Sequence, residues 1–346
     1  SISSLKTDDK GYRKLYINTI NQNETQKYRL RAWVDVDKAY EITNNGGTHS
    51  IKLNSSSYKF KVNVYDTEKP ATDTLIALTD NKENSGLYTI IHSADNTLQI
   101  GTTESITEYR YRGANPKNYV TFNNEVWRII GVFKADDGTG KIENRIKLIK
   151  DQSIGKKFWD TGDSNNWARP ATLNTELNTT YLNSLDSTSK SMIGNTKYYL
   201  GGMDVGLKST QILATTIQIY QYERKISGSD YYYSTNPNSW VGKLALMYVS
   251  DYGYASKNCE NKYILNLDDG DDLGNCSSEN WLHHTDYDWF LNNNAGMRNY
   301  SFTNSVVTFN TIVTASNAVR PTLYLNSLVK ITGGNGTSTN PYTLGL

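Results

Sequence analysis

Two cysteines, Cys259 and Cys276, are the residues whose spacing points most directly to covalent chemistry. A disulfide between them would close a short loop, which on the chain-entropy model stabilises the fold by about 3 kcal/mol. Such a bond also implies an oxidising compartment. Two free thiols are the alternative. A structural zinc site is not expected, because the chain has 4 His and no Cys-x-x-Cys spacing.

An acidic turn lies between the two cysteines, with Asp268, Asp269, Asp271 and Asp272 around Gly270. Closely spaced carboxylates with a glycine for a sharp bend are the hard oxygen ligands that calcium prefers. The spacing departs from an EF-hand, which needs a glutamate at the twelfth position. Calcium at these four aspartates is the one cofactor that the sequence suggests. A solvated acidic turn without metal is the alternative.

A histidine pair, His283-His284, precedes Asp286 and Asp288. A His–Asp pair in a cleft could act as a general base, whereas a polar loop beside tryptophans would leave it inert. The sequence contains no Gly-x-Ser-x-Gly, no His-Glu-x-x-His, no P-loop and no dinucleotide-binding glycine motif. We therefore expect a protein without catalytic activity. A secreted enzyme that uses a cysteine is the alternative.

A cluster of aromatic residues is formed by Tyr231, Tyr232 and Tyr233, followed by Trp240. Tyrosine and tryptophan combine an apolar ring with a polar tip, which suits stacking on sugars or on other proteins. We expect a ligand site at these four residues, with a host or cell-wall glycan as one class of ligand. The alternative is that these rings belong to the core of a large strand-rich domain.

Lysine and asparagine are common on the expected strands, so an autocatalytic Lys–Asn isopeptide crosslink is conceivable. That bond needs a buried lysine and a buried asparagine beside a carboxyl group. The sequence by itself does not place such a trio.

The composition is nearly charge-balanced and rich in polar, uncharged residues. The 346 residues include 36 Lys and Arg against 35 Asp and Glu, for a formal net charge of +1, which argues against a nucleic-acid partner. Hydrophobic residues make up 37% of the chain, and 38 Asn, 26 Tyr and 25 Gly stand beside only 7 Phe. Because these abundant residues are mediocre helix formers, strands and turns are expected to dominate. No apolar stretch reaches the length of a membrane-spanning helix.

The N-terminal part alternates in the manner of half-buried antiparallel strands at 28–34 and 58–64, and 15–19 is a third candidate. A sheet of three or four strands is marginal unless another layer covers it. Residues 1–68 are therefore expected to form the end of a β-sandwich whose opening strands are either missing or supplied by a partner. Residues 69–106 are expected to be a linker or connecting segment with one helical turn near its start.

The C-terminal part, 107–346, is expected to be a larger α+β domain. A β-hairpin is predicted over 119–133 with its turn at 123–125, and the strand 145–150 pairs back onto it. Leucines and a tyrosine at every fourth position predict a helix over 173–193. Further strands are expected at 243–249, 289–291, 305–309 and 320–325, with a strand, glycine turn and strand over 330–344.

Part of the chain resembles a recurring domain in large secreted proteins of low-GC Gram-positive gut bacteria. The similar stretches are 111–133, 240–255, the cysteine pair with Asn280-Trp281-Leu282, 319–325, 330–337 and Pro341-Tyr342. Those domains are distantly similar to C-type-lectin-like and formylglycine-generating-enzyme-like modules. The resemblance implies a loop-rich binding face framed by Trp289 and Arg320-Pro321. Residues 28–64 resemble the end of the β-sandwich of camelysin- and TasA-type matrix-fibre proteins. No catalytic residue is carried over.

The sequence thus predicts a β-rich α+β protein, with an incomplete N-terminal β-sandwich followed by a larger mixed domain of C-type-lectin-like character. The expected function is that of an extracellular cell-surface protein without catalysis, a filament subunit or adhesin built by β-strand complementation. Its expected partners are further copies of itself or a neighbouring surface protein. A lectin-like adhesin that binds a glycan or a protein without polymerising is the alternative. Because the sequence starts at Ser1 without a signal peptide, we expect a removed targeting segment or a fragment.

Overall fold

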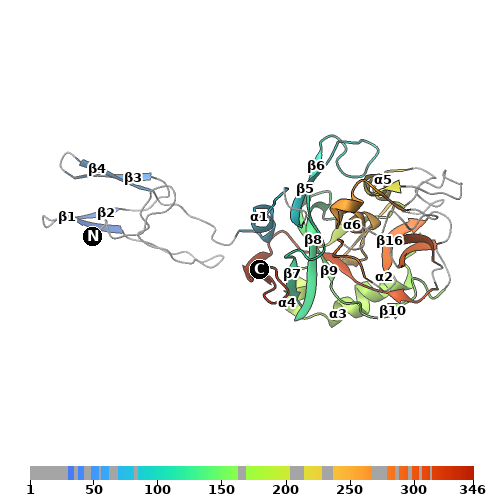
Figure 1. The fold of residues 1–346 in the computed structure, drawn as a ribbon. Helices are drawn as coiled ribbons and strands as arrows, with labels where there is room; N and C mark the ends of the chain where they lie inside the picture. The colour runs from blue at the N-terminus through green and yellow to red at the C-terminus, as the bar shows by residue number, and fades with distance from the viewer. Residues whose placement is uncertain are drawn as a thin grey trace. The chain divides into compact units, whose positions relative to one another are not determined.

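The computed structural model describes residues 30–34, 38–42, 48–53, 56–61, 69–81, 85–162, 169–202, 214–227, 237–265, 279–284, 288–294, 298–303, 306–311 and 314–346. The chain divides into two compact units, unit 1 from Ser1 to Thr67 and unit 2 from Glu68 to Leu346 (Figure 1). Unit 2 begins at Glu68, so it includes residues 69–106, which were expected to connect two domains.

Unit 1 contains two separate antiparallel strand pairs among its described residues. The pairs are β1 (Leu30–Val34) with β2 (Lys38–Ile42), and β3 (Thr48–Leu53) with β4 (Ser56–Lys61). The registers set apolar residues opposite one another, Leu30 with Ile42 and Ile51 with Tyr58. The alternation in the sequence therefore predicted strands where β1 and β4 lie, while the third candidate, 15–19, lies outside the described residues.

A seven-stranded antiparallel sheet forms the centre of unit 2 (Figure 1). Its order is β14-β20-β9-β8-β6-β5, and β7 pairs with the first part of β8. The strands are β5 (Gly86–His92), β6 (Ile106–Arg112), β7 (Tyr119–Phe122), β8 (Glu125–Asp136), β9 (Ile142–Lys150), β14 (Leu244–Ala245) and β20 (Thr322–Tyr324). The sheet and its few short helices confirm the predicted β-rich α+β class.

The hairpin between β7 and β8 turns where the sequence predicted it. Asn123 and Asn124 both have positive φ, 55° and 56°, as the two central residues of a type I′ turn require. Asparagine reaches this left-handed region more readily than most residues that carry a side chain. Two asparagines between alternating strands therefore determine this hairpin locally.

The central strands β8 and β9 are buried on both faces, since consecutive residues along each of them are buried. Helix α1 (Ala71–Ile76) contacts both of these strands and contributes Leu75 to the core. Helices α5 (Thr216–Glu223) and α6 (Val249–Tyr254) pack against each other, and α6 contacts β6 (Figure 1). Together with β5, α1 makes residues 69–106 part of this layered core rather than a linker.

The single helix predicted over 173–193 is interrupted. It consists of α2 (Thr172–Glu176), a π-helical turn (Leu177–Tyr181), α3 (Leu182–Ser184) and, after a break, α4 (Ser187–Met192). Leu185 adopts an extended conformation, and Asp186 begins α4 by accepting a hydrogen bond from Ser189 N at 2.9 Å. The Asn123 side chain accepts the Asp186 N–H at 2.8 Å. This contact from the β7–β8 turn satisfies the peptide group where the helix breaks.

The strand predicted over 243–249 is also shorter than expected. Only Leu244–Ala245 pair in the sheet, and helix α6 begins at Val249. The Asp251 carboxylate accepts the Tyr248 N–H at 2.9 Å and so satisfies a donor at the helix start. An acidic residue three positions after Tyr248 thus turns an apolar run into a helix.

Smaller sheets surround the central one. They are formed by β10 (Lys156–Lys157) with β19 (Asn317–Ala318), β11 (Thr196–Tyr199) with β13 (Ser239–Gly242), β12 (Ala214–Thr215) with β15 (Tyr263–Leu265), β16 (Trp289–Asn294) with β17 (Arg298–Thr303) and β18 (Val306–Thr311), and β21 (Lys330–Gly333) with β22 (Thr343–Gly345). A short 3-10 helix spans Lys257–Cys259. The β21–β22 pair confirms the predicted strand, glycine turn and strand, and Gly334 there has a φ of 80°.

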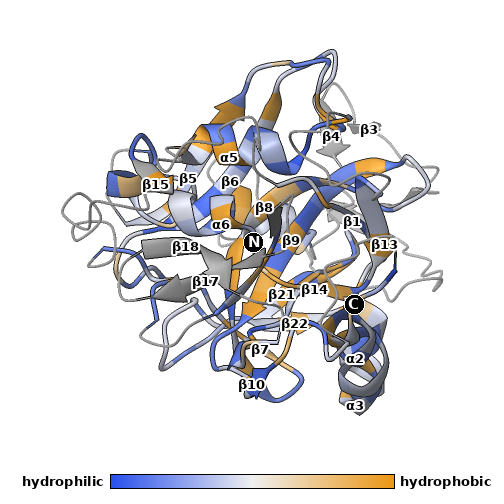
Figure 2. Cartoon of the chain, turned by 90° about the vertical axis from the view of Figure 1, so that its right-hand side faces the viewer, coloured by the Kyte–Doolittle hydropathy of each residue, from blue (hydrophilic) through white to orange (hydrophobic). Residues whose placement is uncertain are grey.

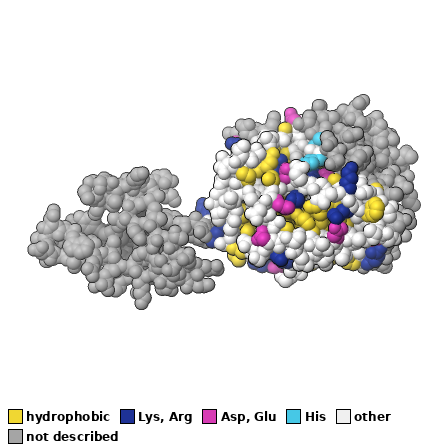
Figure 3. All heavy atoms as spheres, turned by 90° about the horizontal axis from the view of Figure 1, so that it is seen from below, with side chains coloured by type: hydrophobic (Ala, Val, Ile, Leu, Met, Phe, Trp, Pro, Cys, Tyr) yellow, Lys and Arg dark blue, Asp and Glu magenta, His cyan; other side chains and the backbone are white. Residues whose placement is uncertain are grey.

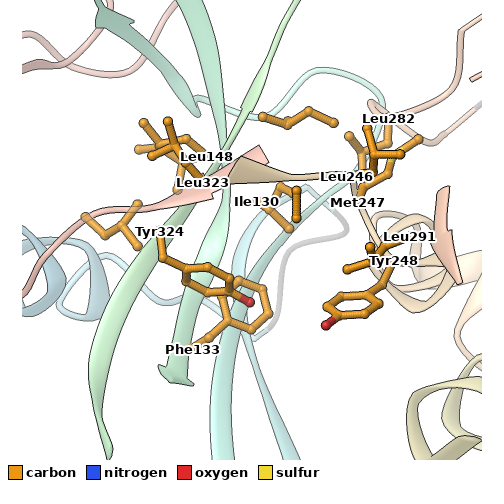
Figure 4. Close-up of a cluster of buried hydrophobic side chains, with 14 of the residues drawn as sticks. Ile130, Phe133, Leu148, Leu246, Met247, Tyr248, Leu282, Leu291, Leu323 and Tyr324 are labelled. Carbon is orange, nitrogen blue, oxygen red and sulfur yellow. The ribbon is translucent and has the colours of Figure 1, made fainter. Parts of the chain in front are cut away.

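The core of unit 2 combines aliphatic side chains with buried tyrosines. Figure 2 shows apolar residues along the central strands, and Figure 4 shows part of this core, in which the Phe133 and Tyr324 rings lie together. The rings of Phe133 and Tyr324 meet edge to face, with centroids 6.0 Å apart. Buried tyrosine hydroxyls bond to the main chain, as Tyr248 does to the Tyr199 oxygen at 3.0 Å. Many of the tyrosines that the composition emphasises are therefore core residues.

Candidate functional site

Six charged side chains are buried together between the central sheet and the helices α5 and α6. They are Glu108 and Arg110 on β6, Lys147 on β9, Glu223 and Arg224 at the end of α5, and Asp251 on α6. None of the six is more than 3% exposed. We call this group the ionic cluster. Three carboxylates face three cations, so the cluster is charge-balanced without any bound ion.

The strand register brings two of the cations into one row. Arg110 pairs with Gly131, Gly131 with Lys147, and Lys147 with Tyr324 across four neighbouring strands. Gly131 is needed at the close approach of β6 and β8, because a Cβ there would overlap the Tyr109 carbonyl oxygen. The row therefore has no side chain between Arg110 and Lys147.

Asp251 of α6 binds both of these cations. Its Oδ1 lies 3.0 Å from Nη1 of Arg110, and its Oδ2 lies 2.5 Å from Nζ of Lys147. Burial alone would raise the pKa of Asp251, but Lys147 and Arg110 outweigh it and the pKa lies below its usual value. Burial lowers the pKa of Lys147, and the nearby Asp251 offsets this only in part.

Glu108 is held by three different donors. Arg110 Nε donates to its Oε2 at 2.9 Å, the Tyr220 hydroxyl donates to Oε1 at 3.1 Å, and His92 Nε2 lies 3.2 Å from Oε2. The Tyr220 ring stacks on the His92 ring at 3.7 Å, and the Arg224 guanidinium carbon lies 3.6 Å from the Tyr220 ring centroid. Burial would raise the pKa of Glu108, yet Arg110 and His92 hold that pKa well below its usual value.

Glu223 ties α5 to α6 and to β16. It accepts from Arg224 Nη1 at 2.7 Å, from the Ser250 N–H at 3.0 Å and hydroxyl at 2.5 Å, and from Asn292 Nδ2 at 2.8 Å. Each carboxylate of the ionic cluster thus accepts at least three hydrogen bonds or ion pairs. All three are therefore paired within the cluster.

A small hollow adjoins the ionic cluster. Its lining includes Glu108 and Arg224 together with Phe133, Tyr248 and Tyr324, and its volume is about 10 Å³. That is room for about one water molecule, which is too small for an organic substrate. The cluster is therefore built to hold two helices on the sheet. Buried ion pairs of this kind are costly to break from one side.

At both edges of the central sheet, an asparagine side chain binds an outer peptide group of the edge strand. On β5, the Thr89 N–H donates to Oδ1 of Asn81 at 2.8 Å, and the neighbouring Leu87 oxygen accepts from Asp80 N at 2.9 Å. These two peptide groups face away from β6. An incoming strand would have to displace the 80–81 segment to pair with them.

On β14, Asn178 binds the outer peptide group of the edge strand with both polar atoms of its side-chain amide. Its Oδ1 accepts the Leu244 N–H at 3.0 Å, and its Nδ2 donates to the Leu244 oxygen at 2.9 Å. Asn178 lies in the π-helical turn that interrupts the predicted helix. Because edge strands with free peptide groups recruit other strands, these contacts hinder strand addition at both ends of the sheet.

Of the four predicted ligand-binding residues, only Trp240 lies among the described residues. Its ring stacks on Tyr198, with centroids 5.8 Å apart and an interplanar angle of 26°. The ring also covers Gly242, where a Cβ would overlap it. Trp240 is half-buried, so part of its ring serves packing. Tyr231, Tyr232 and Tyr233 lie outside the described residues.

Most residues of the predicted disulfide and calcium sites also lie outside the described residues. Cys276 and the four aspartates, Asp268, Asp269, Asp271 and Asp272, lie outside the described residues. Cys259 is fully buried, beside the Thr216 hydroxyl that donates to its carbonyl oxygen at 2.9 Å. Within the described ranges, no group of three or more His, Cys, Asp and Glu side chains is arranged to bind a metal ion.

The histidine pair lies next to a buried ion pair. Asp288 accepts from Arg320 Nε at 2.9 Å, with Nη2 at 2.6 Å, and Arg320 also donates to the Leu282 oxygen. Burial and the positive charge of Arg320 lower the pKa of His284 to about 4. Asp288 is thus paired with Arg320, and its negative charge only partly offsets the lowering of the His284 pKa. Asp286 lies outside the described residues.

Trp289 and Arg320, which the resemblance places in strands that frame a binding face, are both buried. Trp289 is 1% exposed and donates its ring N–H to the Lys157 oxygen at 2.8 Å. Its ring meets Trp159 at a centroid distance of 5.8 Å. Neither Trp289 nor Arg320, which is 3% exposed, presents a side chain to a ligand.

On the face of unit 2 seen in Figure 3, basic and acidic side chains are interspersed and apolar ones are scattered. Each helix in the described part of the chain falls short of the length and apolar content that a membrane crossing requires. Comparison with family models, with curated proteins and with solved structures finds no match for this chain. Any functional assignment therefore rests on the geometry above.

Sequence reasoning missed the ionic cluster and the asparagine caps. One signal was present: in β6 and β9, charged residues alternate with apolar or tyrosine residues at strand spacing. Such alternation is normally a solvated face. Only the tertiary structure reveals that helices cover this face.

Proposed function

We propose that the chain is a non-enzymatic protein of the bacterial cell exterior, a filament subunit or adhesin that associates by β-strand complementation. The observation that carries this proposal is the architecture of unit 1, whose described strands form two separate pairs, β1–β2 and β3–β4. A two-stranded pair is marginal in water on its own. Strand addition from another chain supplies the missing hydrogen bonds and apolar cover.

The capped sheet edges of unit 2 support a proposal in which unit 1, and not unit 2, makes the assembly contacts. Asn81 and Asn178 occupy the outer peptide groups of β5 and β14, so strand addition is directed away from the large sheet. On this proposal unit 1 makes the assembly contacts as a partial β-sandwich. Unit 2 is the domain that the assembly displays, and its lectin-like character belongs to the same proposal.

The state of the buried acids supports a role without catalysis. The carboxylates of the ionic cluster are saturated with donors, and the adjoining hollow holds about one water. An extracellular location would fit a Cys259–Cys276 disulfide. Thiol titration of the unfolded, unreduced chain tests that bond, since two reactive thiols would contradict it.

Self-association is tested on the full chain by sedimentation over a range of concentrations. We expect assemblies that dissociate when a peptide copy of β1 (Leu30–Val34) or β4 (Ser56–Lys61) is added, because the peptide occupies the pairing edge. A peptide copy of β5 (Gly86–His92) is the matched control, since the outer edge of that strand is capped. A chain that stays monomeric at every concentration would contradict the proposal.

Glycan or protein binding without polymerisation is the alternative function. It is supported by the half-buried ring of Trp240 and by the neighbouring Val241, which is 46% exposed. A glycan array with the full chain and with Trp240→Ala and Tyr232→Ala variants tests it. Binding that neither substitution changes would exclude this site.

A further inference from the structure

We propose that Lys147 and Asp251 form an intramolecular isopeptide bond that covalently joins β9 to α6. The two side chains are 0% and 1% exposed, and Lys147 Nζ lies 2.5 Å from Asp251 Oδ2. They are separated by 104 positions in the sequence. The bond would therefore close a long loop between a central strand and a helix that covers the sheet.

The surroundings of Lys147 favour an amine that can act as a nucleophile. Its Nζ lies 4.4 Å from the ring centroid of Tyr248 and 5.5 Å from that of Tyr324. Within the described residues, Asp251 Oδ2 is the hydrogen-bond acceptor of this group, whereas an ammonium carries three donors. Complete burial favours the neutral form of Lys147, against the attraction of the ring faces for its cation. The neutral amine is the nucleophilic form.

Arg110 is placed to activate the carboxyl group. Its Nη1 lies 3.0 Å from Asp251 Oδ1, the oxygen that does not contact Lys147. A fixed cation at this oxygen stabilises the negative charge that develops when a nucleophile adds to the carboxyl carbon. Glu108 accepts a hydrogen bond from Nε of Arg110 and holds the guanidinium in place. Glu108 is therefore a positioning residue.

The condensation is balanced and needs no co-reactant. Lys147 first passes a proton to Asp251 Oδ2, giving a neutral amine and a carboxylic acid. The lone pair of Nζ then forms a bond to Cγ, and Oδ1 takes up the negative charge beside Arg110. A second proton moves from Nζ to Oδ2, the bond between Cγ and Oδ2 breaks, and one water leaves. The product is an amide with one N–H.

Formation of the amide leaves no unpaired charge in the ionic cluster. The reaction removes one cation and one anion together, and the pairs Arg110–Glu108 and Arg224–Glu223 remain. The hollow lined by Tyr248, Tyr324 and Phe133 has a volume of about 10 Å³, which matches the single water that is released.

A second lysine–carboxylate pair in the chain provides a matched control. Lys157 Nζ lies 2.5 Å from Glu176 Oε1, but these side chains are 28% and 36% exposed. Water keeps both groups charged there, and among the described residues no arginine pairs with the Glu176 carboxylate. We therefore expect this pair to remain an ordinary ion pair.

The experiment is the intact mass of the purified full chain after denaturation and reduction. We expect a mass lower than that of the sequence by one water, and a branched peptide linking Lys147 to Asp251 after proteolysis. The Lys157 and Glu176 peptides stay linear. Lys147→Arg restores the full sequence mass. Asp251→Asn gives the same branched peptide with loss of ammonia.

A wild-type chain that shows the full sequence mass would overturn the proposal, and this result does not depend on whether a variant folds. Loss of one water with only linear peptides would also overturn it, because a succinimide would then account for the mass. Since the readout is covalent, failure here leaves the proposed assembly of unit 1 untouched.

Discussion

Asn178 and Leu244 are joined through both polar groups of one peptide unit. Oδ1 of Asn178 accepts the Leu244 N–H at 3.0 Å, and Nδ2 donates to the Leu244 oxygen at 2.9 Å. The side-chain amide takes the place that a neighbouring strand would have on β14. Asn81 does half of this on β5, where it accepts the Thr89 N–H. Part of the asparagine-rich composition therefore serves to close sheet edges.

Replacing Asn178 by alanine is expected to destabilise unit 2 by about 1–3 kcal/mol. The substitution leaves a partly buried N–H and C=O of Leu244 without their partner, and unsatisfied groups carry that cost. Urea unfolding measures the change. Asn183→Ala is the matched control, because Asn183 is an exposed asparagine on the same helical segment, and its effect is expected to stay within about 0.5 kcal/mol. Equal effects would contradict a capping role.

Replacing Asn81 by alanine is expected to expose the outer edge of β5. The Thr89 N–H loses its acceptor, so its hydrogen exchange accelerates, while amides of β5 that bond to β6 keep their protection. Asn81→Asp keeps an oxygen acceptor at the same position and is expected to leave the Thr89 amide protected. Residue-resolved exchange by NMR measures both variants. An unchanged Thr89 rate in Asn81→Ala would rule out the cap.

His284 is expected to make the protein less stable as the pH falls from about 6.5 to about 4. Its pKa is depressed to about 4 by burial and by Arg320, so the folded state favours the neutral ring. The associated stability is fully present above the unfolded value near 6.5 and is lost as the pH falls through 4. His284→Gln is expected to flatten this part of the profile of urea midpoint against pH. A variant whose profile runs parallel to that of the wild type would contradict the assignment.

The parts of the fold that local sequence determines were predictable. The turn of the β7–β8 hairpin follows from Asn123-Asn124, and strand alternation located β1 and β4. At the break at Leu185, Asp186 caps α4 locally, whereas the contact from Asn123 that accepts the Asp186 N–H comes from a distant turn. A periodic leucine pattern reports burial on one side and carries no information about such a contact.

The ionic cluster could not be predicted from the sequence either, because its residues come together only in the tertiary structure. Lys147 and Asp251 are 104 positions apart, and neither strand alternation nor charge pattern indicates that a helix delivers the acid to the lysine. The predicted site residues were chosen from runs of one residue type, such as Tyr231–Tyr233 and Asp268–Asp272. Those runs lie in segments outside the described residues, so their roles stay predictions.

Replacing Gly131 by alanine is expected to disturb the join between β6 and β8. The added Cβ would overlap the Tyr109 main-chain oxygen, and main-chain atoms in a buried ladder cannot move aside. We expect a loss on the order of 3 kcal/mol, typical of overpacking in a buried site. Ala135→Ser, near the end of the same strand, is the comparison for a small change. A fully stable Gly131→Ala protein would show that this approach is looser than the structure indicates.

Replacing Glu108 by glutamine is expected to destabilise the folded state on the order of 3 kcal/mol at neutral pH, because Arg110 then lacks one of its two buried carboxylate partners. The pKa of Glu108 lies below its usual value despite burial, since Arg110 and His92 outweigh that cost. Its contribution is therefore present above the unfolded value near 4.3 and is lost as the pH falls below it. Glu108→Gln should remove part of the acid sensitivity in this range. Urea midpoints of both proteins at neutral and acidic pH measure this, and a constant difference at all pH values would contradict it.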